Sequence, residues 1–290
     1  MTEPSSLHLF LMAVLQGVTE LFPISSLGHS VLVPGMLHWP LDRDAPWFLP
    51  FIVVLHLGTA SALLLYFWRD WWQLLAGLWR ARGGANNAEA RLFWMLVVGT
   101  IPAGLIGLAL HHQISRLFGL FELAAIFLMV NGLMLLIGDS LKRRTPDGGL
   151  GTLTWRKAVL IGVAQSVALI PGMSRSGATL VAGLGAGLDY AAAARFSFLL
   201  ATPIIAAAGV LEVPKLLHHG IPGGLLHVIV LAGLLAGVFA WLSTWFLMRW
   251  FSGHEVSALR PYAVYCLLMG ALAIGGGLKP AGRLRISFYK

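Results

Sequence analysis

The chain contains 290 residues, of which 58% are hydrophobic and 11% are charged. A typical soluble domain has about 25% charged and about 45–50% apolar residues, so this composition excludes a soluble enzyme, a disordered chain and a coiled coil. The net charge of +8 does not indicate nucleic-acid binding, because the basic residues lie between apolar segments, as in the loops of membrane proteins. We therefore expect an all-α integral membrane protein. The single cysteine, Cys266, excludes an intramolecular disulfide and a zinc site built from several cysteines.

Six apolar segments are long enough to cross a bilayer, and they cover residues 47–68, 92–110, 120–138, 196–213, 224–248 and 262–278. The first would form a helix about 33 Å long, which matches a hydrocarbon core of about 30 Å. Because the first 42 residues contain no Lys or Arg, we expect no cleavable signal peptide.

Two further apolar regions, 7–38 and 158–189, are interrupted by polar residues. In each region, two short apolar arms flank a centre that contains Pro, Gly and Ser. Neither arm is long enough to span a bilayer comfortably. We expect both regions to be re-entrant hairpins, whose non-helical tips must be covered by protein or line a water-filled cavity.

The order of these segments predicts one polytopic domain, 1–290, made of two repeats at about 1–150 and 151–290. Each repeat would contain a broken hairpin followed by three spans. The hairpins share a weak pattern of Gln, then Pro, then Ser three residues later: Gln16, Pro23 and Ser26 in the first, Gln165, Pro171 and Ser174 in the second. Three spans are an odd number, so we expect inverted repeats whose broken tips meet near the midplane of the membrane and form a binding site.

Basic residues predict the orientation. Segment 69–91 contains four arginines and segment 139–157 contains five Lys or Arg, whereas the intervening loop at 111–119 contains only Arg116. The positive-inside rule places both basic segments in the cytoplasm, so the first hairpin would enter from the outside. The same count places the basic C-terminal tail outside, against this rule.

The first tip contains Gln16, Glu20, Ser25, Ser26 and His29. An ionised side chain at the bilayer centre costs about 2.5–3.5 kcal/mol on insertion scales, which makes Glu20 a functional candidate. Gln16 and Glu20 are four residues apart and share one helical face, while Ser25 or Ser26 suits an N-cap. Ser26 and His29 would share a face of the following helix, and a hydroxyl and an imidazole near a carboxylate can carry out nucleophilic or acid–base chemistry. A packed, hydrogen-bonded His29 is the alternative.

The second tip contains Ser174, Arg175, Ser176 and Thr179 after a Pro-Gly break. A helix that begins near Ser174 would present free N–H groups, three hydroxyls and the guanidinium of Arg175 to an anion such as phosphate. The alternatives are a small-residue packing site and a structural ion pair between Glu20 and Arg175. Neither tip contains the phosphate loop of ATP-binding proteins.

Residues Gln16–His29 and Pro171–Thr179 resemble the two hallmark motifs of the undecaprenyl pyrophosphate phosphatase family, the bacitracin-resistance membrane phosphatases. Segments Leu55–Thr59 and Arg195–Pro203 are also similar to family segments. The resemblance implies a hydrolase that removes the terminal phosphate of a polyprenyl pyrophosphate lipid, with a divalent cation, at the outer face of the bacterial plasma (inner) membrane. This activity recycles the lipid carrier for peptidoglycan synthesis. The chain departs from the family at Gln16 and Arg195, where many members have glutamate.

With this resemblance, we expect Glu20, Ser26, His29 and Arg175 to be catalytic. The expected substrate-binding residues are Gln16, Ser25, Ser174, Arg175, Ser176 and Thr179. Glu20, with or without Gln16, would hold Mg²⁺ or Ca²⁺. Ser26 is the candidate nucleophile and His29 its base, while direct attack by water and a covalent role for His29 stay open.

A lipid-phosphate transporter or flippase is the rival hypothesis, because inverted repeats with broken helices are a transporter architecture. A transporter would not need Ser26 and His29 beside Glu20. A purely structural assembly factor would leave both polar tips unexplained. The sequence leaves the oligomeric state, including a homodimer, open.

Overall fold

The computed structural model of the chain describes residues 5–41, 45, 47–110, 113, 114, 117, 120–142, 148–219, 225–254 and 256–276. Within these ranges every regular element is helical, and the only β-type interaction is an isolated bridge between Gly148 and Leu188. This confirms the predicted all-α class. The helices, in chain order, are α1 (Ser6–Thr19), α2 (Ser26–Met36), α3 (Phe48–Tyr66), α4 (Trp68–Arg80), α5 (Ala88–Ala109), α7 (Phe121–Lys142), η1 (Leu150–Thr152), α8 (Trp155–Gln165), η2 (Ser166–Leu169), α9 (Arg175–Gly185), α10 (Tyr190–His219), α11 (Leu226–Ser252) and α12 (Arg260–Gly275).

Four helices, α5, α7, α10 and α11, are each long and apolar enough to cross a bilayer, and α3 with α4 passes the same test as a pair bent by 72°. These helices match five predicted spans and describe a multi-pass membrane protein. The sixth predicted span, 262–278, forms the shorter apolar helix α12, which has 16 residues. Its predicted last two residues lie outside the described ranges.

Helix α4 was not predicted, because the Arg-containing segment 69–91 was interpreted only as a cytoplasmic connection. Its exposed apolar side chains are spaced along one helical face: Trp68, Trp72, Leu75 and Trp79. A helix with Trp and Leu on one face and basic residues nearby is typical of a helix that lies in the membrane interface. Arg195 of α10 donates from Nε to Asp70 Oδ1 of α4 at 2.7 Å. Arg195, where the resemblance leads us to expect glutamate, therefore attaches α4 to α10.

Both predicted broken hairpins are present. The first helix pair, α1 and α2, is interrupted at residues 20–25, where Ser25 has a φ of 72° and accepts a hydrogen bond from Gly28 N, as the predicted N-cap. The second pair, α8 and α9, is interrupted after η2, where Gly172 has a φ of 98°. A side chain on Gly172 would collide with the carbonyl of Ala124 in α7, so glycine is needed for both conformation and space.

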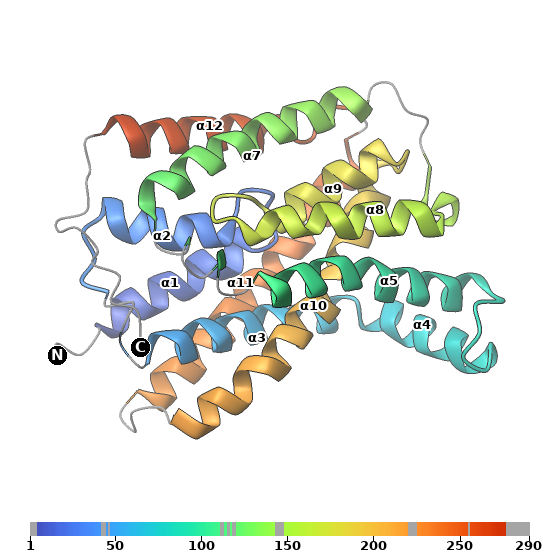
Figure 1. Cartoon of the computed structure of the whole chain (residues 1–290), viewed down its shortest axis with the longest axis horizontal. Helices are drawn as coiled ribbons and strands as arrows, with labels where there is room; N and C mark the ends of the chain where they lie inside the picture. The colour runs from blue at the N-terminus through green and yellow to red at the C-terminus, as the bar shows by residue number, and fades with distance from the viewer. Residues whose placement is uncertain are drawn as a thin grey trace.

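The two hairpins enter from opposite ends of the helix bundle, and their tips meet in the middle (Figure 1). The packing is reciprocal, because α1 contacts α11 and α8 contacts α5, while α7 packs against α12. If each repeat is a hairpin followed by three spans, a two-fold axis between the repeats would make each hairpin contact a span of the other repeat in this way. The inverted repeat itself stays a prediction.

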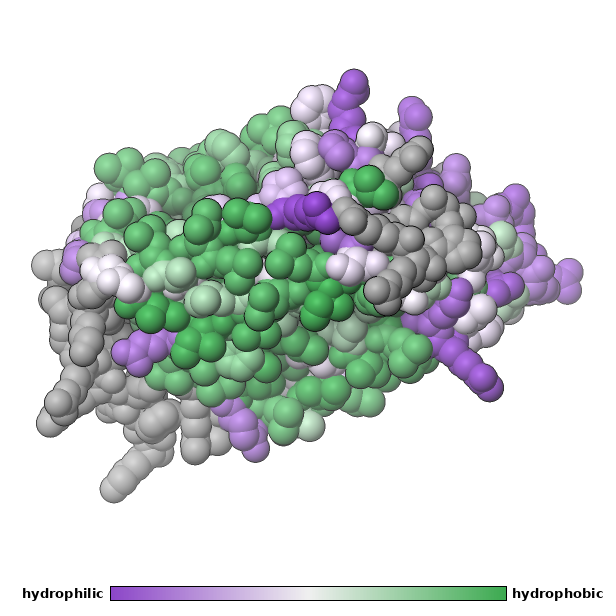
Figure 2. Space-filling view, turned by 90° about the horizontal axis from the view of Figure 1, so that it is seen from above, coloured by the Kyte–Doolittle hydropathy of each residue, from purple (hydrophilic) through white to green (hydrophobic). Residues whose placement is uncertain are grey.

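The described parts of the two predicted cytoplasmic segments, 69–91 and 139–157, lie at the same end of the bundle. Figure 1 shows the α4–α5 connection and the start of α8 together at the right of the view. Figure 2 shows hydrophilic residues gathered at that end, whereas much of the remaining described face is hydrophobic. The basic tail, 277–290, lies outside the described residues, so its predicted location is not tested.

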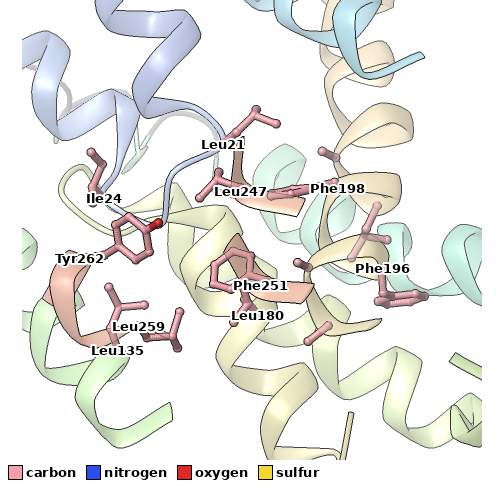
Figure 3. Close-up of a cluster of buried hydrophobic side chains, with 14 of the residues drawn as sticks. Leu21, Ile24, Leu135, Leu180, Phe196, Phe198, Leu247, Phe251, Leu259 and Tyr262 are labelled. Carbon is pink, nitrogen blue, oxygen red and sulfur yellow. The ribbon is translucent and has the colours of Figure 1, made fainter. Parts of the chain in front are cut away.

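Buried apolar side chains anchor the first tip (Figure 3). Leu21 and Ile24, from the break between α1 and α2, belong to one cluster with Leu180 of α9 and with Leu247 and Phe251 of α11. Inside a membrane protein such contacts stabilise mainly through close packing, because lipid is as apolar as the core. The non-helical tip is therefore held by the helices around it.

Candidate active site

A cavity of about 410 Å³ lies where the two tips meet α3, α5 and α10. Most of its wall is apolar, with residues such as Ile52, Leu57, Leu169 and Ile204. The polar side chains that line it are Glu20, Ser25, Ser26, His56, Gln165, Ser174 and Arg175. A ligand with one charged and one apolar part suits such a cavity.

Glu20 is the centre of the hydrogen-bond network. Its Oε2 accepts from Ser26 Oγ at 2.6 Å and from Gln16 Nε2 at 3.0 Å, and its Oε1 accepts from Arg175 Nη2 at 2.8 Å. Glu20 and Arg175 side chains are 8% and 13% exposed, so each buried charge has the other as its counter-ion. The ion pair between Glu20 and Arg175, which the sequence suggested as an alternative, is present in the structure. It also holds the Glu20 carboxylate next to the hydroxyl of Ser26.

His29 does not form the predicted pair with Ser26. Its Nδ1 is 2.7 Å from the carbonyl oxygen of Ser25, so this nitrogen carries the hydrogen, and Nε2 then accepts from Tyr265 Oη at 2.7 Å. The ring also stacks on Tyr265 of α12. Ser26 and His29 both lie in the first turn of α2, but a partner from α12 binds His29 while Glu20 binds Ser26. The packed, hydrogen-bonded alternative describes His29.

His56 of α3 lines the cavity near Glu20, whereas His29 does not line it. Its Nδ1 lies 2.9 Å from the carbonyl of Ile52 and therefore donates, which leaves Nε2 directed to Glu20 Oε2 at 3.8 Å. In the sequence, His56 lies within the segment Leu55–Thr59 and was not predicted to be a site residue. Its position as a polar residue inside an apolar span was the signal that could have identified it.

The second tip divides its polar residues between the cavity and the protein interior. Ser174 and Arg175 line the cavity, and Ser174 Oγ caps α9 by accepting from Gly177 N. Ser176 Oγ donates to Phe22 O of the first tip at 3.1 Å, and Thr179 Oγ1 is 2.6 Å from Ser197 Oγ of α10. Ser176 and Thr179, which were expected to bind substrate, are not among the residues that line the cavity, and their hydroxyls bind neighbouring segments.

Gln16 and Ser25 were both expected to bind substrate. Gln16 is buried behind Glu20 and does not line the cavity, whereas Ser25 does line it. The structure thus brings five of the nine predicted site residues to the cavity wall, namely Glu20, Ser25, Ser26, Ser174 and Arg175.

Asn131 of α7 joins the two tips and was not identified from sequence. Its Nδ2 donates to Pro23 O in the first tip at 2.8 Å, and its Oδ1 accepts from Ser174 N in the second at 3.0 Å. The residue is completely buried. A single amide in an apolar span was again the available signal.

The described residues contain no group of three or more His, Cys, Asp or Glu that could hold a metal ion. Among the described residues, Glu20 is the one carboxylate that lines the cavity, and Gln16, Ser26 and Arg175 already donate to it. A carboxylate has about four lone-pair positions, so one stays open. Mg²⁺ can bind through a single carboxylate when phosphates and water supply the other ligands. The residues fit a cation that arrives with a phosphate ligand.

Comparisons with known proteins agree with this chemistry. Residues 9–272 match the family model described as bacitracin resistance protein BacA. Undecaprenyl-diphosphatase 2 of Chromobacterium violaceum is 53% identical over 270 residues, which are 93% of this chain and 98% of that protein. Undecaprenyl-diphosphatase of Acidiphilium cryptum is 55% identical over 268 residues, 91% of this chain and 95% of that protein.

Proposed function

The chain belongs to the bacitracin resistance protein BacA family and is a membrane hydrolase of the undecaprenyl-diphosphatase type, and we propose that the cavity between its two helix breaks is where the diphosphate is hydrolysed. The observation that carries this proposal is the 2.6 Å hydrogen bond from Ser26 Oγ to Glu20, whose other oxygen is held by Arg175. A hydroxyl, its base and a guanidinium are thereby assembled in one buried place.

The cavity suits both parts of the substrate. The guanidinium of Arg175 and the N-termini of α2 and α9 supply positive potential for the diphosphate. The apolar wall formed by α3, α5 and α10 would take the first isoprene units of the tail. The rest of the tail would lie in the surrounding lipid.

Ser26 is the proposed nucleophile. Its proton passes to Glu20 Oε2 along the existing hydrogen bond while Oγ attacks the terminal phosphorus. The bond from that phosphorus to the bridging oxygen breaks, and polyprenyl phosphate leaves. Water then attacks the phosphoserine, Ser26 Oγ leaves and recovers the proton held by Glu20, and inorganic phosphate departs with the oxygen and both protons of the water. Direct attack by water next to Glu20 is the alternative.

Arg175 stabilises the phosphoryl oxygens, on which charge accumulates during transfer. His29 holds the carbonyl of Ser25, next to the nucleophile, and so positions the first tip. A divalent cation, Mg²⁺ or Ca²⁺, would contact Glu20 and neutralise phosphate charge when the diphosphate brings it into the cavity.

We place the protein in the bacterial plasma (inner) membrane with the cavity open to the outer side. The basic segments at one end of the bundle support this orientation, because they are typical of the cytoplasmic side. A cysteine at Ser25, in a Cys266→Ala background, should react with a membrane-impermeant thiol reagent outside intact cells. Labelling only in inverted vesicles would overturn the proposed orientation. A homodimer stays a prediction.

Phosphate release by the purified protein in detergent tests the function, because transport is impossible there. We expect release from a polyprenyl diphosphate in the presence of Mg²⁺. Absence of release from folded, metal-supplied protein would refute the proposed hydrolysis. The comparisons give the lipid-phosphate transporter hypothesis no support.

A further inference from the structure

Gln165 lines the same cavity but has no role in the chemistry described so far. The residue is 2% exposed, and neither its Nε2 nor its Oε1 has a hydrogen-bond partner among the described residues. An unsatisfied buried amide lowers the stability of the folded protein. Its presence therefore points to a ligand that supplies the missing partners.

The matching position in the first hairpin shows why Gln165 is unsatisfied. Gln16 is followed four residues later by Glu20, which accepts its Nε2–H at 3.0 Å. Gln165 is followed four residues later by Leu169, whose side chain has no polar atom. In addition, α8 ends at Gln165 and the chain continues as η2. The amide therefore belongs to a residue that stands at a helix break and lines the cavity.

A second unsatisfied donor lines the cavity. Arg175 uses Nη2 to hold Glu20, but its buried Nη1 has no partner among the described residues. Gln165 and Arg175, from the two ends of the second tip, thus line one cavity, and each has a buried donor, Nε2 or Nη1, without an acceptor among the described residues. Diphosphate oxygens are acceptors of the kind that both groups need.

We propose that Gln165 is a substrate-binding residue whose Nε2 donates to an oxygen of the diphosphate, together with Arg175 Nη1. Its Oε1 accepts a hydrogen bond from water next to that phosphate. The inference rests on the proposed function, which supplies a diphosphate to this cavity. It assigns a contact to α8, the arm of the second hairpin for which the sequence predicted no site residue.

The test uses Gln165→Met, which keeps the size of the side chain and removes the amide. Ser166→Ala is the matched control, because the adjacent Ser166 Oγ is also buried without a partner but does not line the cavity. Without substrate, both variants should unfold at the wild-type temperature or above it, since each removes an unsatisfied group. Only Gln165→Met should raise the KM for farnesyl diphosphate, by roughly tenfold or more.

Thermal stabilisation by ligand is the second measurement. Farnesyl diphosphate and inorganic diphosphate should each raise the unfolding temperature of wild type and Ser166→Ala, and the shift should shrink in Gln165→Met. If inorganic diphosphate does not change the unfolding temperature of wild type, the role of Gln165 is judged from the shift that farnesyl diphosphate produces in wild type and in Gln165→Met. Gln165→Asn, which retracts the amide by one methylene, should show the same loss and replaces Gln165→Met if that variant does not fold.

A Gln165→Met protein that unfolds at a lower temperature but keeps wild-type KM and ligand shifts would refute the inference, because the amide would then serve only the fold. That result would leave the proposed hydrolysis intact if wild type still releases phosphate. If wild type releases no phosphate, the proposed function fails, while the ligand shifts still decide the role of Gln165.

Discussion

Replacing Arg175 with lysine tests the phosphate-binding role most directly. The guanidinium holds Glu20 Oε1 with Nη2 at 2.8 Å and leaves Nη1 buried and without a partner among the described residues. One planar group can therefore bind the carboxylate and a phosphoryl oxygen at the same time. The lysine ammonium is a single point and cannot occupy both nitrogen positions.

We expect Arg175→Lys to lower kcat/KM at least tenfold, which corresponds to about 1.4 kcal/mol of transition-state stabilisation. The lost contact is one charge-assisted hydrogen bond, and such bonds contribute about 1.5–3 kcal/mol. Phosphate release from a polyprenyl diphosphate in detergent with Mg²⁺ provides the measurement, and thermal unfolding confirms that the variant is folded.

Arg195→Lys is the matched control, because Arg195 pairs with Asp70 on α4 and does not line the cavity. This pair is partly exposed, so its loss should change stability by about 1 kcal/mol or less and leave kcat/KM near that of wild type. A folded Arg175→Lys protein with wild-type turnover would refute the phosphate role. Equal losses in both variants would mean that the substitution acts through the fold.

Three further changes test the rest of the site. Glu20→Gln should reduce phosphate release by roughly 10²–10⁴-fold, because it removes the acceptor of the Ser26 proton. Added Mg²⁺ should not restore this variant, whereas it should restore wild-type protein that has been treated with a chelator. Normal turnover of metal-free wild type would disprove the cation proposal. Ser26→Ala should lose more activity than His29→Ala, because both nitrogens of His29 bind groups other than Ser26; the opposite order in a phosphate-release assay would favour a direct role for His29. Asn131→Ala should lower the free energy of unfolding by about 1–3 kcal/mol for each buried group left without its partner, and it should also lower the activity. Unchanged thermal unfolding would show that the two tips do not depend on this amide.

The sequence alone determined where the helices are broken. The signals are Pro23, Ser25 and the Pro171-Gly172 pair. Each acts on the backbone next to it, so these residues predict breaks and N-caps without knowledge of the fold. The sequence also singled out Glu20 and Arg175 by their position within apolar segments, because a charge surrounded by apolar sequence must find a partner. The structure contains both helix breaks and pairs Glu20 with Arg175.

The partners of these residues depended on tertiary structure. Whether His29 binds Ser26 or Tyr265 is decided by the packing of α12, which lies more than 200 residues away in the chain. His56 reaches Glu20, and Asn131 joins the two tips, because α3 and α7 pack beside the breaks. Sequence spacing specifies which side chains share a face of one helix, but it does not specify which other helix meets that face. Contacts between helices arise only when the whole bundle packs, and in this protein they determine which polar groups line the cavity and which hold it together.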